Sequence, residues 1–265
     1  MQVFADDGAR IDASVDGRER AHAIVLIHGF PFARAIWDMQ TDALAKRWLV
    51  VRPDLRGAGK SSAPEGPYLM ERLASDVAVL LDALGIERAA LIGHSMGGYV
   101  ALAFARMFTE RITHLALVSS RLRADTPDEA ATRCALAERI ERQGDIEPVI
   151  CAYLPRLFAP RTLAQHADVV DRAYAIARQN GAAGASGTLR GMALRAPSDD
   201  IAQDLAAPML IVAGACDNVI TLQEAHSIAR SFARGNLAVC DASGHLPMME
   251  EPQRVSEALE AWLNE

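Results

Sequence analysis

Residues 91–102 read LIGHSMGGYVAL, an apolar run that ends on Gly93, then a serine two residues later and two further glycines. The string matches G-x-S-x-G and lies between a predicted strand and a predicted helix, the context in which this motif presents a nucleophile. A serine on so tight a turn has a strained backbone, and Gly93 and Gly97 remove the Cβ atoms that would collide around it. The stretch therefore predicts either an ordinary strand-to-helix turn or a nucleophilic Ser95, and the rest of the chain must decide.

Apolar runs alternate with helical patterns on both sides of this stretch. Six runs are continuous rather than alternating, which predicts buried strands of a parallel sheet: 23–29, 49–54, 89–95, 112–120, 208–214 and 236–242. Helical spacing predicts helices at 37–47, 70–84, 97–108, 221–233 and 252–263. Residues 2–20 predict a leading hairpin. Repeated strand-then-helix order predicts an α/β fold with a doubly wound, mostly parallel sheet.

The alternation stops between about residues 122 and 200. Helical patterns occur at 127–144 and 168–180, no convincing strand is present, and NGAAGASG (180–187) reads as a loose stretch. We interpret the segment as a helical cap, or lid, inserted after the sixth strand. The predicted division is core 1–121, cap 122–200, and a second core part 201–265 that carries the acid and the histidine.

Composition limits the function classes. The chain has 265 residues, 51% of them hydrophobic, and a formal net charge of −7, which argues against a nucleic-acid partner. It contains no secretory n-region and h-region and no apolar run of about 20 residues, so neither a signal peptide nor a membrane partner is expected. Four cysteines without CxxC spacing predict reduced thiols. We therefore expect a cytoplasmic protein.

A nucleophilic serine needs a base, and seven histidines are available. His245, in DASGHLPMMEEP, follows the last predicted strand, where a base can reach over the carboxyl edge of the sheet. His94 flanks the serine, but its side chain should leave the turn in another direction, and His166 falls in the predicted cap. Structural roles are the better interpretation for His22, His114 and His226. His245 is the predicted base.

The base needs an orienting acid at the same edge. Asp217, in VAGACDNVI, lies just past the preceding predicted strand. Asp241 is nearer to His245 in sequence, with a turn or capping role as the simpler interpretation. The predicted catalytic residues are therefore Ser95, His245 and Asp217.

The order Ser95, Asp217, His245 resembles that of the α/β-hydrolases. The resemblance covers roughly 20–120 and 205–265, and the predicted cap makes the chain similar to capped esterases, lactonases and cofactor-free haloperoxidases. HGFPFARAIW (28–37) resembles the H-G-x-P loop of this family, which implies an oxyanion hole. Its backbone N–H donors would be those of Phe30 and Met96.

Two neighbouring residues and one further loop have simpler interpretations. His28 is expected to hold the H-G-x-P loop through a structural hydrogen bond, and Trp37 to pack in the core. PDLRGAGKS (53–61) also resembles a family loop, where we expect Asp54 and Arg56 to have a structural role.

The resemblance implies hydrolysis of a small-molecule substrate by acyl transfer, with no metal or organic cofactor. A small to medium carboxylic ester or lactone is the first expectation. The open alternatives are a C–C hydrolase or enol-lactonase of aromatic degradation, a perhydrolase, and a small-molecule receptor of the same fold. Serine as nucleophile disfavours epoxide hydrolases and dehalogenases, which use aspartate.

The predicted cap says little about the substrate. Residues 121–200 contain 11 arginines and 11 acidic residues, so the predicted cap shows no bulk charge preference. Its apolar and aromatic residues suggest a mainly apolar pocket near Ser95, although some must attach the cap to the core: Tyr153, Leu154, Leu157, Phe158 and Tyr174.

Overall fold

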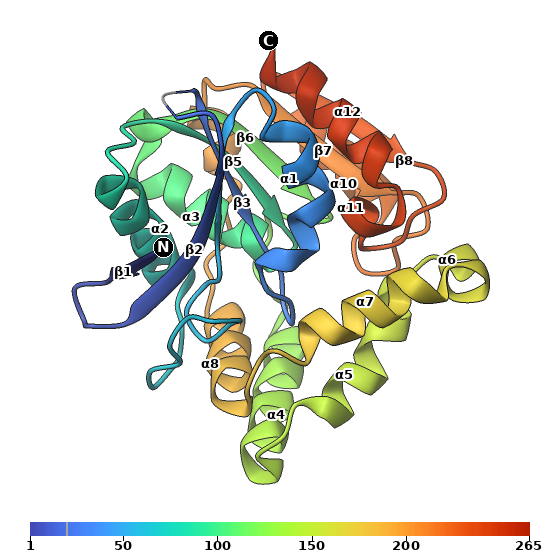
Figure 1. The fold of residues 1–265 in the computed structure, drawn as a ribbon. Helices are drawn as coiled ribbons and strands as arrows, with labels where there is room; N and C mark the ends of the chain where they lie inside the picture. The colour runs from blue at the N-terminus through green and yellow to red at the C-terminus, as the bar shows by residue number, and fades with distance from the viewer. Residues whose placement is uncertain (20) are drawn as a thin grey trace.

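An eight-stranded sheet forms the centre of the computed structural model, which describes residues 1–19 and 21–265 (Figure 1). The strands are β1 (Gln2–Phe4), β2 (Arg10–Gly17), β3 (Ala23–Ile27), β4 (Leu49–Pro53), β5 (Ala89–His94), β6 (Ile112–Val118), β7 (Met209–Gly214) and β8 (Gly235–Cys240). Their order is β1-β2-β4-β3-β5-β6-β7-β8. The β1–β2 and β2–β4 pairs are antiparallel, and all other pairs are parallel. The predicted doubly wound, mostly parallel sheet is confirmed.

Helices cover both faces of the sheet, which explains why its central strands are apolar throughout. Every residue of β3, β5 and β7 is buried. Helices α1 (Asp38–Leu44) and α12 (Pro252–Leu263) lie on one face, and α2 (Met70–Ala83) and α3 (Met96–Met107) lie on the other (Figure 1). Helix α10 (Leu222–Ser231) packs on β7 and β8.

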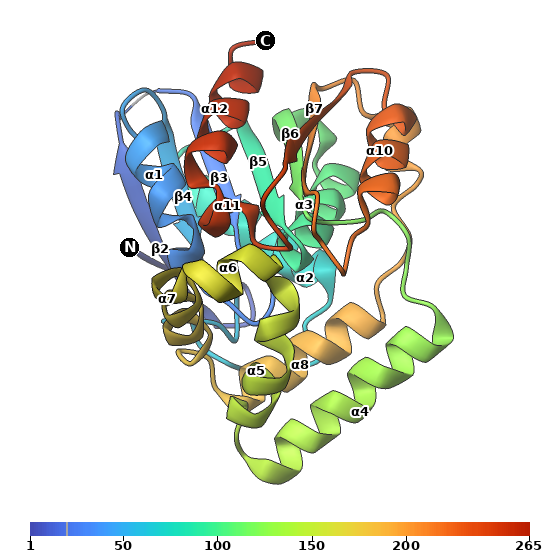
Figure 2. The same cartoon turned by 90° about the vertical axis from the view of Figure 1, so that its right-hand side faces the viewer.

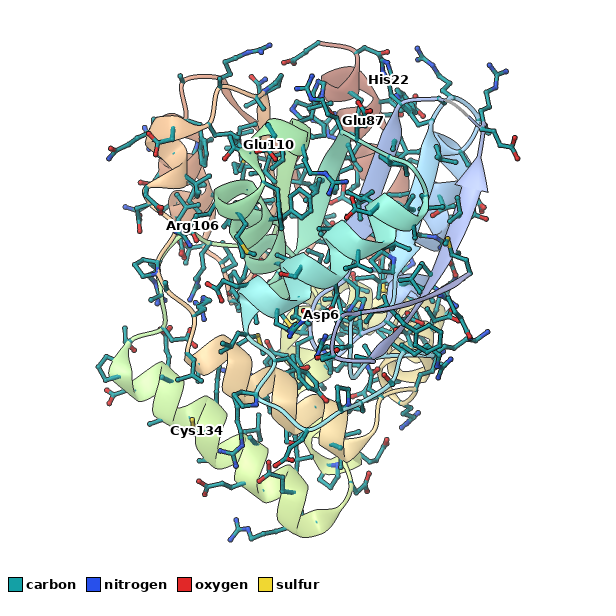
Figure 3. The ribbon with its side chains drawn as sticks, turned by 90° about the vertical axis from the view of Figure 1, so that its left-hand side faces the viewer. Asp6, His22, Glu87, Arg106, Glu110 and Cys134 are labelled. Carbon is teal, nitrogen blue, oxygen red and sulfur yellow. The ribbon has the colours of Figure 1, made fainter. Side chains whose placement is uncertain are left out.

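Further helices lie between β6 and β7, and residues 122–200 are called the helical insertion below. They are α4 (Pro127–Gln143), α5 (Glu147–Tyr153), α6 (Pro160–Gln165), α7 (Ala167–Ala177) and α8 (Ala182–Ala193), with a short 3₁₀ turn at Leu154–Leu157 and the short α9 (Ile201–Asp204) following. They gather at one end of the sheet (Figure 2). Cys134 marks that end, whereas His22 and Glu87, which precede β3 and β5, lie at the other (Figure 3). The insertion therefore lies at the carboxyl ends of the parallel strands.

The expectation of a loose stretch at 180–187 is wrong, because most of it lies in helix α8. A Cβ on Gly184 would lie 1.9 Å from the carbonyl oxygen of Gly57, and one on Gly191 would lie 1.7 Å from that of Tyr68. Because these glycines have no side chain, the backbone of α8 packs directly against the backbone of the 57–68 loop. Packing against the core therefore outweighs the low helix propensity of glycine here.

Two further observations concern other sequence predictions. Within the described residues, no helix is both long and apolar enough to span a membrane. All four cysteines are free thiols, of which Cys151 is exposed and Cys240 is buried. Burial raises the pKa of Cys240 to about 12.

Candidate active site

Ser95 lies on a strained turn between β5 and α3. Its φ is +49° and its ψ is −113°, a combination that a residue with a side chain rarely adopts. A Cβ on Gly93 would lie 2.2 Å from the carbonyl oxygen of Gly97, and one on Gly97 would lie 2.3 Å from that of Ile27. The Ser95 N–H donates to the carbonyl of Val118 at 2.9 Å. The glycines therefore permit the turn, and β6 holds it.

The turn brings Ser95 against His245, which in turn contacts Asp217. Nε2 of His245 lies 3.0 Å from Ser95 Oγ, and Nδ1 lies 2.8 Å from Asp217 Oδ2. His245 is 1% exposed and Asp217 8% exposed, so bulk water competes little for these contacts. When the Nδ1–H group donates a hydrogen bond to the carboxylate of Asp217, Nε2 is unprotonated and can accept the serine proton. The geometry therefore suits removal of that proton as Oγ attacks an electrophile.

The loop after β7 prepares Asp217 to act as an anion. The backbone N–H groups of Val219 and Ile220 donate to its Oδ1 at 2.7 and 3.0 Å. Burial acts to raise its pKa, but the facing His245 and these N–H donors hold the pKa below its ordinary value. Asp241, the nearer carboxylate in sequence, is exposed just after β8. The structure brings Asp217 to His245.

The loop that carries His245 is held on both sides of the histidine. The His245 N–H donates to the carbonyl of Leu157 in the helical insertion at 2.6 Å. Glu250 Oε1 accepts from the N–H groups of Gly244 at 2.9 Å and Leu246 at 3.3 Å. Burial raises the pKa of the Glu250 carboxyl. Sequence reasoning missed Glu250; its position five residues after the histidine was the available signal.

His94 has a supporting contact that the sequence did not reveal. Its Nε2 lies 3.0 Å from the carbonyl oxygen of His245. The ring is fully buried, which together with the nearby His245 lowers its pKa to about 3. A neutral His94 can donate this hydrogen bond and so orient the His245 backbone.

The two expected oxyanion donors line one small cavity. Phe30 and Met96 border a space of about 10 Å³ together with Gly29 and Pro31. Within residues 1–19 and 21–265, the N–H groups of Phe30 and Met96 make no hydrogen bond to another protein atom. Met96 is also the first residue of α3, where free N–H groups and the helix dipole favour a negative charge.

His28 has the structural contacts expected of it. Its Nε2 accepts from the N–H of Leu55 at 3.0 Å, and its Nδ1 lies 3.1 Å from the carbonyl oxygen of Gly29. Burial lowers the pKa of the ring, which therefore stays neutral. Trp37 is fully buried in the core.

The 53–61 loop is held by buried charges. The Asp54 carboxylate accepts from the backbone N–H groups of Arg34 and Lys60, both at 2.9 Å. Arg56 pairs with Asp76 at 2.6 Å and with Asp7 at 2.9 Å. These contacts agree with the structural role expected of Asp54 and Arg56.

Comparison with known proteins agrees with this fold. A family model described as the alpha/beta hydrolase fold matches residues 22–252. The chain is 28% identical to 3-oxoadipate enol-lactonase 2 of Acinetobacter baylyi over 245 residues, covering 92% of this chain and 90% of that protein.

Solved structures superpose closely. A thermophilic esterase from Thermogutta terrifontis, solved with malate bound, is 33% identical with a TM-score of 0.95, over 100% of this chain and 98% of that chain. The enol-lactonase from Burkholderia xenovorans is 27% identical with a TM-score of 0.91, over 100% of both chains. The chain therefore belongs to the alpha/beta hydrolase fold family.

Proposed function

We propose that this protein is a serine hydrolase that cleaves a small to medium carboxylic ester or lactone through an acyl-enzyme intermediate. The observation that carries the proposal is the continuous hydrogen-bonded series from Ser95 through His245 to Asp217, with the serine on a strained turn. The family supports a hydrolase, and the esterase and enol-lactonases named above support esters and lactones as substrates.

The proposed chemistry proceeds in two halves. His245 accepts the Ser95 proton as Oγ attacks the carbonyl carbon, and the N–H groups of Phe30 and Met96 stabilise the oxyanion. His245 then protonates the leaving alkoxide, which departs as the acyl-enzyme forms. In the second half His245 activates water, the acid is released, and Ser95 regains its proton. Asp217 keeps the imidazole in one tautomer. This sequence of steps requires no metal or organic cofactor.

We further propose that residues 122–200 act as a cap between the core segments 1–121 and 201–265. The contact of Leu157 with His245 and the location of the insertion at the carboxyl edge support this role. Leu154, Leu157 and Phe158 are all buried, as expected of residues that attach a cap to a core. The absence of nucleic-acid and membrane partners and the cytoplasmic location stay predictions.

The test is steady-state hydrolysis of 4-nitrophenyl esters from acetate to octanoate by the wild type and by Ser95→Ala. We expect multiple turnovers by the wild type and a decrease in kcat of at least about 10,000-fold in the variant. A series of simple lactones followed in a pH-stat extends the test to cyclic esters. Equal turnover by both proteins would contradict the proposal. A single turnover with ligand-dependent thermal stabilisation would favour a receptor instead.

A further inference from the structure

A buried cluster of charged side chains lies where the helical insertion meets α3. Asp125 accepts from Arg133 Nε at 2.6 Å and pairs with Arg195 Nη1 at 2.8 Å. The Asp125 and Arg195 side chains are 1% and 3% exposed, and that of Arg133 is 25% exposed. Arg195 also lies over the ring of Tyr99, with its central carbon 4.1 Å from the ring centroid. The cluster therefore connects α4 and the segment that follows α8 to the first turn of α3, the helix after Ser95.

This cluster holds more positive than negative charge. Two guanidinium groups share the single carboxylate of Asp125. Arg195 has further acceptors, because it donates to the carbonyls of Met192 and Arg123, both at 3.1 Å. Within the described residues, Nη1 of Arg133 has only the thioether sulfur of Met192, at 3.7 Å. Nη2 of Arg133 also donates to Asp125, at 3.4 Å. A thioether is a weak acceptor, so Nη1 of Arg133 retains unused donor capacity.

Neighbouring charges do not supply the missing acceptor. Arg121 is paired with Glu129 and Glu224, so these carboxylates are already engaged. One carboxylate oxygen of Asp217 is hydrogen-bonded to His245, and the other accepts from backbone N–H groups. The carboxylates of the cluster and of the site thus have partners, whereas Arg133 lacks a second anion.

Two tyrosines add potential donors to this region. Tyr99 lies four residues after Ser95, and Tyr153 ends α5. Among the tyrosines that the structure describes, only Tyr68 places its hydroxyl in a protein hydrogen bond. Burial raises the pKa of Tyr153, so its phenol stays protonated as a donor.

Tyr153 also links the cluster to the candidate active site. The charges of both Arg133 and Asp217 act on its phenol, which therefore lies within electrostatic reach of each. Burial acts to lower the pKa of Arg133, but the pairing with Asp125 raises it overall, whereas burial raises the pKa of Tyr153. Both side chains keep accessible surface. The Arg133 side chain is thus accessible beside a buried carboxylate, so an anion can reach its Nη1.

We infer that Arg133, together with the hydroxyls of Tyr99 and Tyr153, forms a subsite for a substrate carboxylate, so that the preferred ester or lactone carries a free carboxylate. The anion would supply the acceptors that these donors lack and would balance the second guanidinium. The inference rests on the proposed function, whose substrate class it narrows. It also explains why the equal totals of arginine and acidic residues in 121–200 give no guide to specificity: the surplus charge of the cluster is local.

The first experiment compares matched pairs of esters. The mono-4-nitrophenyl esters of succinate, glutarate and adipate are compared with 4-nitrophenyl butyrate, pentanoate and hexanoate, which have the same acyl chain lengths without the carboxylate. We expect the ratio of kcat/KM, anionic over neutral, to fall at least about tenfold in Arg133→Gln for the chain length that suits the wild type. Arg133→Lys should give an intermediate ratio.

Two further variants separate recognition from folding. Arg190→Gln removes a half-buried arginine of the same insertion, which pairs with Glu141 at 2.8 Å, and should keep the wild-type ratio. Tyr153→Phe removes one proposed donor and keeps the ring, so the ratio should fall several-fold. If Arg133→Gln does not fold, Arg133→Lys and Tyr153→Phe decide the matter.

The second experiment does not depend on turnover. Titration calorimetry measures binding of succinate, glutarate and adipate to Ser95→Ala and to Ser95→Ala/Arg133→Gln. We expect at least about tenfold weaker binding to the double variant. An effect of Arg133 on either the ester ratio or dicarboxylate binding supports the subsite, and no effect on both overturns it. If the wild type does not turn over esters but binds dicarboxylates in a way that depends on Arg133, only the proposed function is contradicted. If it turns over esters and Arg133 affects neither measurement, only the subsite is contradicted.

Discussion

Single residues around Ser95 show how local chemistry can be read from a short stretch. The positive φ of Ser95 is possible because the Cβ atoms that would block the turn are missing at Gly93 and Gly97. The residue between Gly93 and Ser95 has a different task, because the side chain of His94 supports the backbone of His245. The motif thus combines the proposed nucleophile with a support for the proposed base.

The choice between the two carboxylates is a testable consequence. Asp217→Asn should lower kcat by about 1,000-fold or more, because an amide cannot stabilise the imidazolium and permits the wrong tautomer. Asp241→Asn, at an exposed carboxylate, should leave kcat within about twofold. The measurement is steady-state hydrolysis of the best 4-nitrophenyl ester. A larger loss in Asp241→Asn than in Asp217→Asn would contradict the assignment.

His94 predicts a pH dependence of stability. Its pKa is lowered from 6.5 to about 3, so the folded protein keeps it neutral while the unfolded chain binds a proton below pH 6.5. The unfolded state then binds more protons, and the free energy of unfolding falls as the pH decreases from 6.5 towards 3. This residue contributes on the order of 1 kcal/mol per pH unit over that range.

Urea unfolding of the wild type and of His94→Gln between pH 7 and pH 5 checks this dependence. Glutamine can still donate to the His245 carbonyl but does not titrate. The variant should therefore show a shallower loss of stability with decreasing pH, whatever its stability at pH 7. The buried His28, whose pKa is also lowered, leaves a residual slope of the same sign. Identical slopes for the two proteins would show that His94 is not held neutral.

Most of what the sequence predicts correctly about the fold is the position of helices and strands. The strand and helix that flank Ser95 were expected at 89–95 and 97–108 and are observed as β5 (Ala89–His94) and α3 (Met96–Met107). Long apolar runs and helical spacing are local properties, so they can be read from one chain. Helix α8 was missed because its glycines are explained only by what packs against them.

The close packing of α8 predicts a strong effect of a single methyl group. Gly184→Ala should lower the free energy of unfolding by about 2 kcal/mol or more, because backbone of Gly57 occupies the space that the new Cβ needs. Gly181→Ala is the matched control, since a Cβ there would meet no atom within 4 Å. Chemical unfolding of both variants measures the difference. Equal stability of the two would mean that α8 can move away from the loop at no cost.

A half-buried side chain, Glu250, joins the helical insertion to the His245 loop, in addition to the contact between Leu157 and His245. Glu250 accepts from the Ala159 N–H at 2.8 Å and from the Thr162 hydroxyl at 2.6 Å, as well as from the N–H groups on both sides of His245. One carboxylate thus sets the positions of the insertion and of the predicted base relative to each other.

Removing this carboxylate should affect both stability and rate. Glu250→Ala leaves buried donors without an acceptor, and each such group costs about 1–3 kcal/mol, so we expect a loss of about 3 kcal/mol in unfolding free energy. The His245 loop should also shift, which lowers kcat by about 10- to 100-fold. Glu257→Ala, at an exposed position of α12, is the control. Ester hydrolysis and urea unfolding measure the two effects. A loss of stability with unchanged kcat would show that Glu250 does not position His245.

The sequence by itself determined the sheet, the place of the insertion and the turn that holds Ser95, because each follows from local spacing of apolar residues, glycines and polar groups. Tertiary structure decided the contacts between segments. Asp217 and His245 are 28 residues apart and His245 and Ser95 are 150 apart, so their distances depend on strand order. The supports at Glu250 and His94 and the unused donor of Arg133 depend on side-chain directions that packing sets. The sequence pattern does not reveal these contacts, because each needs partner atoms from several helices, strands or loops at hydrogen-bond distance.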